Sequence, residues 1–259
     1  MSADKTLKPG IRRLRKDQKS QKRGTRLVGR ALKSSVKTAK GRKTSSTRWL
    51  KRQLNDPYVV EAKKQGYRNR AAFKLIELDN RFQFLAKGSS VLDLGAAPGG
   101  WSQVAAERTN SFGKDGKKGR VIGLDIKEIE AIPGVEFLQG DLLDAAASTR
   151  LLNLMDGSID IVLSDMAAGA TGHSATDHLR IMVLLEAAID FAVQVLAPGG
   201  TFVGKVFKGG TENDVLAQLK RDFKSVRHAK PPASRNESSE SYVIAQGFCS
   251  KLSMHRHSV

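Results

Sequence analysis

The sequence predicts an α/β protein with a mostly parallel sheet, preceded by a basic tail. Three observations carry this prediction. Short apolar segments alternate with helix-like segments between about residues 91 and 248. Acidic residues stand repeatedly where the short segments end, and a glycine-rich stretch at 91–103 joins the first of them to a helix. Strands that alternate with helices form parallel sheets with right-handed crossovers.

The net charge of +18 belongs mainly to the first 50 residues, which carry 17 Lys and Arg against two acids. Like charges and little apolar area predict a disordered tail at 1–50, followed by one domain at 51–259. Such a tail is attracted to polyanions, and nucleic acid is the expected partner because the large apolar face of a membrane-binding helix is missing. A merely solubilising tail and a mitochondrial transit peptide are the weaker alternatives; the lysine richness and the weak apolar face of the tail argue against the second.

Several classes of protein are disfavoured by composition. No apolar run approaches 18 residues, so neither a membrane span nor a signal peptide is expected. The only cysteine is Cys249, which excludes a disulfide framework and suits a reducing, cytoplasmic location. The five histidines have no metal-binding spacing, so we expect no metal. We expect a monomer without membrane contact.

Residues 51–85 are predicted to form a helical segment at the start of the domain. A short helix near 57–65 should end at Gly66, and a second should span about 70–82. The second helix carries a polar row at spacings of four, three and four. Its members are Arg70, Lys74, Glu77 and Arg81. The ordinary interpretation of such a row is a solvated charged face.

From residue 91 onward the pattern predicts seven strands and four helices. The strands are expected at 91–95, 120–125, 135–138, 159–164, 201–207, 225–229 and 242–248. The helices are expected at 99–110, 144–154, 177–196 and 212–223. The result is a mostly parallel seven-stranded sheet with helices on both faces. In such sheets ligands bind beyond the carboxyl ends of the strands.

Four acids fall at or near those carboxyl ends: Asp93, Asp125, Asp141 and Asp165. Small residues in the first turn, with Gly95 at its start, would let a ligand lie against bare backbone. Asp125 is placed to accept hydrogen bonds from both hydroxyls of a ribose, which NAD and S-adenosylmethionine both carry. Asp141 could meet an adenine amino group, or it could simply cap a loop.

The turn itself favours S-adenosylmethionine. It reads Gly-Ala-Ala-Pro-Gly-Gly instead of the dinucleotide pattern G-x-G-x-x-G, and Trp101 follows it. A donor with a cationic sulfonium and no phosphate needs acids more than it needs an anion cradle. An NAD-dependent oxidoreductase is therefore the less favoured alternative.

Five separated stretches resemble one family. They are YRNRAAFKL at 67–75, DLGAAPGGWSQ at 93–103, FLQGD at 137–141, LSDMA at 163–167 and LAPGGTFVGKVF at 196–207. In this order and spacing, over about residues 56–248, they resemble the FtsJ/RlmE ribosomal RNA ribose 2′-O-methyltransferases. The resemblance implies a Rossmann-like methyltransferase fold that uses S-adenosylmethionine. Residues 168–169 depart from it, since Ala-Gly replaces the usual Pro-Asn.

The resemblance also implies a Lys-Asp-Lys-Glu catalytic set, which falls on Lys74, Asp165, Lys205 and Glu240. The glutamate is chosen because it lies two residues before Tyr242, and Glu237 is the alternative. With the turn residues included, the expected cofactor-binding residues are Asp93, Gly95, Pro98, Gly99, Trp101, Asp125, Asp141 and Asp165.

These residues suggest a mechanism. Lys205 would take the proton of a ribose 2′-hydroxyl as general base, while Asp165 orients its amine and faces the sulfonium. Lys74 would position the hydroxyl, and Glu240 would orient Lys74. A lysine acts as a base only in its neutral form; neighbouring positive charge favours that form and Asp165 opposes it. The sequence leaves open which effect is larger.

The substrate implied by the resemblance is a uridine ribose in 23S ribosomal RNA of the large subunit. Transfer RNA and mitochondrial ribosomal RNA are alternative substrates. A catalytically weak RNA-binding assembly factor is an alternative of another class, although all four catalytic positions hold the required residue types.

Overall fold

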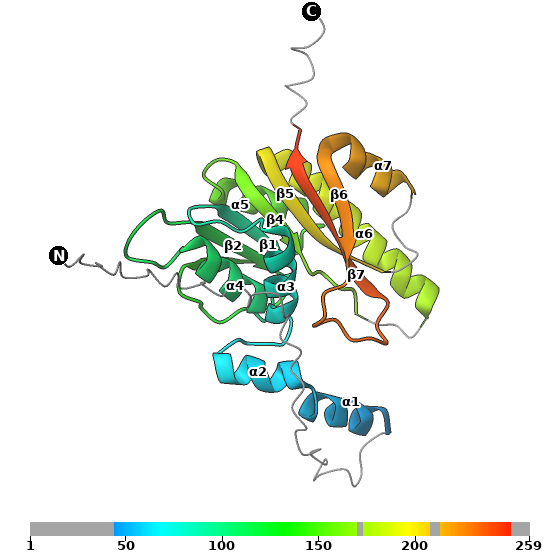
Figure 1. Cartoon of the computed structure of the whole chain (residues 1–259). Coiled ribbons are helices and arrows are strands. Elements are labelled where there is room, and N and C mark those ends of the chain that lie inside the picture. The colour runs from blue at the N-terminus through cyan, green and yellow to red at the C-terminus, as the bar shows by residue number, and fades with distance from the viewer. Residues whose placement is uncertain (1–43, 170–172, 208–212, 250–259) are drawn as a thin grey trace, which may run out of the picture. The chain divides into compact units, whose positions relative to one another are not determined.

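Seven strands form one sheet in the order β3-β2-β1-β4-β5-β7-β6 (Figure 1). They are β1 (Ser90–Leu94), β2 (Arg120–Asp125), β3 (Val135–Gln139), β4 (Ile159–Ser164), β5 (Leu196–Phe207), β6 (Phe223–Ala229) and β7 (Glu240–Phe248). All neighbours are parallel except β7, which runs antiparallel to both β5 and β6. The computed structural model describes residues 44–169, 173–207 and 213–249. The predicted mostly parallel sheet is confirmed.

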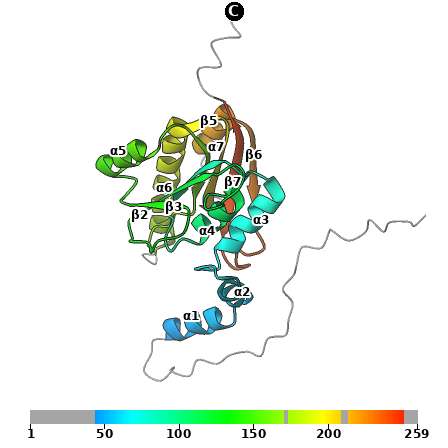
Figure 2. The ribbon, with the colours of Figure 1, turned by 90° about the vertical axis from the view of Figure 1, so that its left-hand side faces the viewer.

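Helices cover both faces of this sheet, as expected (Figure 2). On one face lie α3 (Ala72–Phe82) and α4 (Gly100–Thr109), and on the other α5 (Ala145–Leu154), α6 (Ser174–Val195) and α7 (Asn213–Asp222). Successive strand side chains point to opposite faces. Val91 therefore packs in the core under α3 and α4, whereas Leu92 and Leu94 join the core under α5, α6 and α7.

Two further helices precede the sheet: α1 (Thr44–Leu54) and α2 (Pro57–Gln65). The predicted bounds of α2 are correct, because its ends carry strong local signals. Asp56 accepts a hydrogen bond from the Tyr58 amide as the N-cap, and Gly66 closes the helix at a φ of 79°.

Helix α1 was not predicted, and the expected tail boundary at residue 50 falls inside it. Its first turn reads Thr-Ser-Ser-Thr, and these residues favour caps and loops over helix interiors. The tail prediction for residues 1–43 lies outside the described part of the chain.

The junction of α6 and β5 also differs from expectation. The helix ends at Val195 and the strand starts directly at Leu196, five residues before the predicted start. The Pro-Gly-Gly sequence at 198–200 therefore lies within the strand, where the pairing with β4 shifts register between Ile159 and Ile161. In the described ranges, no helix combines the length and apolar character that crossing a membrane requires.

Candidate active site

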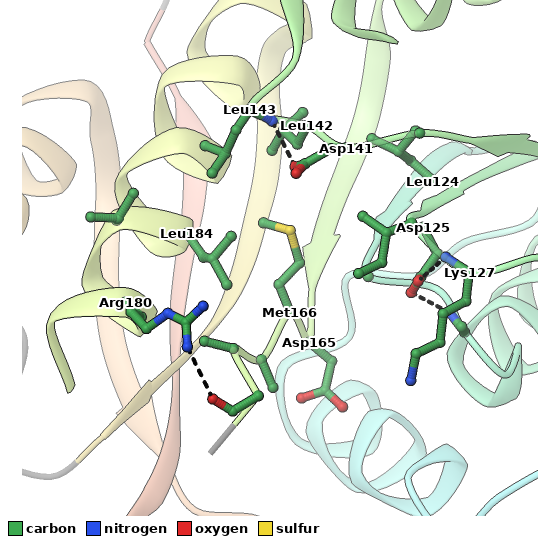
Figure 3. A pocket seen from close by; sticks show the side chains of 18 residues that line it. Leu124, Asp125, Lys127, Asp141, Leu142, Leu143, Asp165, Met166, Arg180 and Leu184 are labelled. Carbon is green, nitrogen blue, oxygen red and sulfur yellow. Dashed lines mark hydrogen bonds between the residues drawn. The ribbon is translucent and has the colours of Figure 1, made fainter. Parts of the chain in front are cut away.

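A pocket of about 550 Å³ opens beyond the carboxyl ends of β1, β2 and β4 (Figure 3). Four of the predicted cofactor residues line it, namely Gly95, Asp125, Asp141 and Asp165. In Figure 3, Arg180 of α6 lies on the opposite side of the pocket from Asp125. The strand-end position expected from the topology is therefore where the pocket is found.

Gly95 lines the pocket with its backbone, as we expected from the small residues of the turn. Gly95 has a φ of 77°, a conformation that residues with a Cβ rarely adopt. A Cβ there would also lie 2.7 Å from Cγ of Met166, which lines the same pocket. Glycine is thus required both by the turn and by the close approach of the segment after β4.

Asp125 and Asp141 each hold a loop and also face the pocket. Asp125 accepts hydrogen bonds from the backbone amides of Ala97 (2.8 Å, Oδ2) and Lys127 (2.9 Å, Oδ1). Asp141 accepts one from the Leu143 amide (3.0 Å). Each carboxylate oxygen has two acceptor positions, so both residues keep capacity for a ligand. Loop capping and ligand binding are therefore compatible.

Asp93 occupies a different environment from the other acids. It is fully buried against α4, where Ser102 donates a hydrogen bond of 2.6 Å to Oδ2, and Oδ1 has no hydrogen-bond partner. Burial raises the pKa of Asp93 to about 7; the charges of Asp165 and Asp125 add to this rise, and the Ser102 hydrogen bond opposes it. Asp93 does not line the pocket. Its hydrogen bond from Ser102 instead ties β1 to α4, the two elements that the turn connects.

The three other predicted cofactor residues also lie outside the pocket lining. Trp101 is buried, donates from Nε1 to the carbonyl of Ala71 (2.8 Å), and packs on Tyr242 with ring centroids 5.6 Å apart. The Pro98 carbonyl accepts a hydrogen bond from Arg68 (3.0 Å), and Gly99 is the N-cap of α4. For these residues the structure shows supporting contacts where the sequence suggested direct ones.

The four predicted catalytic residues come together in one chain of contacts. Lys205 Nζ lies 2.7 Å from the backbone carbonyl oxygen of Asp165 and 3.1 Å from its Oδ1. Lys74 Nζ lies 2.8 and 2.9 Å from the two carboxylate oxygens of Glu240. Tyr242 joins the two pairs, because its hydroxyl accepts from Lys74 (3.2 Å) and donates to Asp165 Oδ1 (2.8 Å).

Burial makes these contacts electrostatically strong. Both lysines are only 8% exposed, and Tyr242 is fully buried. Burial disfavours the charge on Asp165, but Lys205, Lys74 and the hydrogen bonds from Tyr242 and Lys205 outweigh it, so the pKa of Asp165 is lowered. Burial and the nearby charges of Asp165 and Glu240 hold the pKa of Tyr242 well above 10. The tyrosine is therefore a neutral hydrogen-bonding bridge.

The contacts of the two candidate glutamates favour Glu240 over Glu237 as the partner of Lys74. Glu237 is mostly exposed and lies 4.0 Å from Arg52, which is a surface ion pair. Glu240 lies at the start of β7, contacts Lys74, and accepts a second hydrogen bond from Ser234 (2.8 Å).

Tyr242 is the member that the sequence missed. In the sequence, Tyr-Val-Ile-Ala is typical of an ordinary core strand, and nothing in that pattern assigns the tyrosine hydroxyl a role. One signal was present, because a buried tyrosine hydroxyl usually needs a partner.

Asp165 belongs to both parts of the site. It follows β4, lines the pocket, and contacts Lys205 and Tyr242. Anything bound in the pocket against Asp165 therefore lies close to two buried lysines. Within the described ranges, no cluster of three or more His, Cys, Asp or Glu could hold a metal ion.

Known proteins resemble this chain over most of its length. The profile of FtsJ-like methyltransferases matches residues 67–248. The protein named ribosomal RNA large subunit methyltransferase E of Rhodospirillum rubrum is 60% identical over 230 residues, covering 88% of this chain and 87% of that protein. The protein of the same name from Parvibaculum lavamentivorans is 58% identical over 234 residues, covering 89% and 92%.

A solved structure from Plasmodium falciparum, described as a ribosomal RNA methyltransferase, has the same fold. It superposes with a TM-score of 0.63 at 36% identity, covering 71% of this chain and 100% of that one. The profile match spans well over half of the chain and includes Lys74, Asp165, Lys205 and Glu240. The chain belongs to the FtsJ-like methyltransferase family.

Proposed function

We propose that this chain transfers a methyl group from S-adenosylmethionine to the 2′-hydroxyl of a uridine ribose in 23S ribosomal RNA. The observation that carries the proposal is the double position of Asp165, which joins a pocket at the strand ends to two buried lysines. The names of the similar bacterial proteins support ribosomal RNA of the large subunit as the substrate.

The residues of the pocket fit this donor. Three carboxylates line it, and a cationic ligand is stabilised by nearby negative charge. Asp125 would accept from the ribose hydroxyls, Asp141 would meet the adenine, and Asp165 would face the sulfonium. When bound, the donor supplies a methyl group already activated by positive sulfur.

The lysines would act on the acceptor. Lys205, in its neutral form, would take the proton of the 2′-hydroxyl as the ribose oxygen bonds to the methyl carbon and the carbon–sulfur bond breaks. The ammonium so formed would stay beside Asp165, whose carbonyl and carboxylate already accept from Nζ. Lys74 would hold the ribose oxygen in line, with Glu240 orienting it.

The basic N-terminal tail would add affinity for RNA without reading its sequence, since phosphate contacts act through charge. We further propose that the protein acts as a monomer in the cytoplasm, where ribosomal subunits are assembled.

The test is a methyl-transfer assay with labelled donor and three acceptors: large subunits, free ribosomal RNA and transfer RNA. We expect transfer to ribosomal RNA and a fall of about a hundredfold or more in kcat for Lys205→Ala, because general bases contribute about 10²–10⁴. Donor affinity, measured by calorimetry, should be retained. Lys220→Ala, an exposed lysine of α7, is the matched control.

Three outcomes would overturn parts of the proposal. Preferred transfer to transfer RNA would contradict the substrate. Wild-type turnover in Lys205→Ala with intact donor binding would contradict the base. If Glu237→Ala lost methyl transfer while Glu240→Ala kept it, Glu237 would replace Glu240 in the proposed catalytic set.

A further inference from the structure

Polar residues of α3 and of the turn before it have a role beyond that of Lys74. Arg70 and Glu77 flank Lys74 by about one turn on either side, and both reach the same residue, Ala233, in the loop between β6 and β7. Arg70 Nη2 donates to the Ala233 carbonyl (2.6 Å), and the Ala233 amide donates to Glu77 Oε2 (2.6 Å). Both backbone polar groups of one fully buried residue are thus held, the amide by Glu77 of α3 and the carbonyl by Arg70 in the turn just before that helix. We call this arrangement the Ala233 clamp.

Helix α2 and its N-cap residue contact both side chains of the clamp. Asp56 Oδ2 lies 2.9 Å from Nε of Arg70, as an ion-pair contact rather than a directed hydrogen bond. The Tyr58 hydroxyl donates to the other carboxylate oxygen of Glu77 (2.9 Å). Both arms of the clamp therefore have a second partner, which limits the movement of their side chains.

Ser234, the residue after Ala233, contacts one of the predicted catalytic residues, Glu240. Ser234 is 3% exposed, and its hydroxyl donates to Glu240 Oε1 (2.8 Å). Lys74 Nζ lies 2.8 Å from the same oxygen. The contacts thus close a ring that runs from α3 through Ala233 and Ser234 to Glu240 and back to α3 at Lys74.

We propose that Ser234 is a positioning residue for methyl transfer, held in place by the Ala233 clamp. The inference rests on the proposed function, because it assigns Ser234 a part in the same reaction. Ser234 fixes the carboxylate of Glu240, and that carboxylate fixes the Nζ of Lys74. Small errors in the position of a group that aligns reacting atoms lower the rate strongly.

The geometry explains why this support is needed. Glu240 is the first residue of β7 and follows directly on the loop. It pairs with Phe207 of β5, whereas the pairing of β7 with β6 begins only at Tyr242. Its carboxylate must meet an ammonium that also contacts the Tyr242 hydroxyl. A hydrogen bond from a buried serine selects one orientation of the carboxylate, which the ion pair alone does not do.

The test compares Ser234→Ala in two backgrounds. In the wild-type background we expect kcat to fall about tenfold, while KM for RNA and the Kd of the donor change less than about twofold. In the Glu240→Ala background the same substitution should change kcat less than about twofold, because Ser234 acts through Glu240. Ser234→Thr, which keeps a hydroxyl, should recover part of the activity.

The matched control is Ser239→Ala, an exposed serine next to Glu240 in the same loop, which should leave kcat unchanged. Equal losses for Ser234→Ala in both backgrounds would show a purely structural role and overturn the proposal. Should Ser234→Ala fail to fold, Glu77→Gln weakens one arm of the clamp and should lower kcat in the wild-type background only.

A second readout does not depend on activity. Acylation of lysines with acetic anhydride, followed by mass spectrometry, reports how well Lys74 is held. We expect Ser234→Ala to raise the labelling of Lys74 at least threefold and to leave Lys205 unchanged. If the wild-type protein transfers no methyl group but Ser234→Ala raises the labelling of Lys74, the proposed function fails and with it the part of Ser234 in methyl transfer, whereas the hold of Ser234 on Lys74 stands. Unchanged Lys74 labelling in a folded Ser234→Ala protein would overturn the positioning itself.

Discussion

Replacing the buried Asp93 by asparagine should remove a large part of the pH dependence of stability. The pKa of Asp93 is raised to about 7 in the folded protein, chiefly by burial, from a model-peptide value of 3.8. The folded state therefore keeps a proton that the unfolded chain releases above pH 3.8. Stability must fall as the pH rises from that value and level off above pH 7.

The size of the effect follows from the shift. Each pKa unit corresponds to roughly 1.4 kcal/mol, so the free energy of unfolding should carry a penalty of about 4 kcal/mol at pH 8. Between pH 5 and pH 8 this contribution should change by roughly 3 kcal/mol. Asparagine has a similar shape and can accept from Ser102, but it does not titrate in this range.

Urea unfolding of both proteins at pH 5, 6, 7 and 8 measures this difference. The free energy of unfolding of the wild type should fall relative to Asp93→Asn as the pH rises, and the two should run parallel above about pH 8. A constant offset across the range would refute the assignment of Asp93 as a buried, protonated acid.

Three further predictions concern the site and its surroundings. Tyr242→Phe removes the hydroxyl that links the two lysine pairs, so kcat should fall about 10- to 100-fold with donor Kd unchanged; a wild-type kcat in the assay would contradict this. Gly95→Ala should cost about 2 kcal/mol or more in urea unfolding, against about 1 kcal/mol for Gly66→Ala, because only at position 95 would the Cβ meet another residue, Met166. Similar losses for the two variants would count against the close packing of the turn. Deleting residues 1–43 should weaken RNA binding and flatten the plot of log K against log salt, leaving donor binding intact. An unaltered salt slope would exclude the tail as a phosphate-binding element.

Much of the fold could be predicted because its signals are local. The strands at 120–125 and 159–164 have the predicted bounds, since polar or turn residues interrupt the apolar run at each end. The bounds of helix α2 were predicted correctly because residues with strong capping preferences, Asp56 and Gly66, flank it. The order of the strands was not predictable, because the insertion of β7 between β5 and β6 depends on contacts between distant segments.

The site was predictable in its members more than in its geometry. Motif positions identified Lys74 and Lys205, but only the fold shows that Tyr242 joins them. The polar row of Arg70, Lys74, Glu77 and Arg81 was expected to be a solvated face. Of these four residues only Arg81 is exposed, and it lies over the ring of Phe82. A helix-wheel pattern cannot reveal that a loop some 160 residues later covers that face.

The antiparallel strand β7 has a consequence for the order in which the protein is made. Among the residues that the structure describes, those that line the pocket lie between positions 95 and 184, so they are translated before β7. Glu240 and Tyr242, which tie Lys74 to Asp165, are among the last residues of the domain to leave the ribosome. A growing chain that stops before β7 has the pocket-lining residues but lacks the link between its lysines. The proposed methyl transfer therefore requires that β7 has been made and has paired with β5.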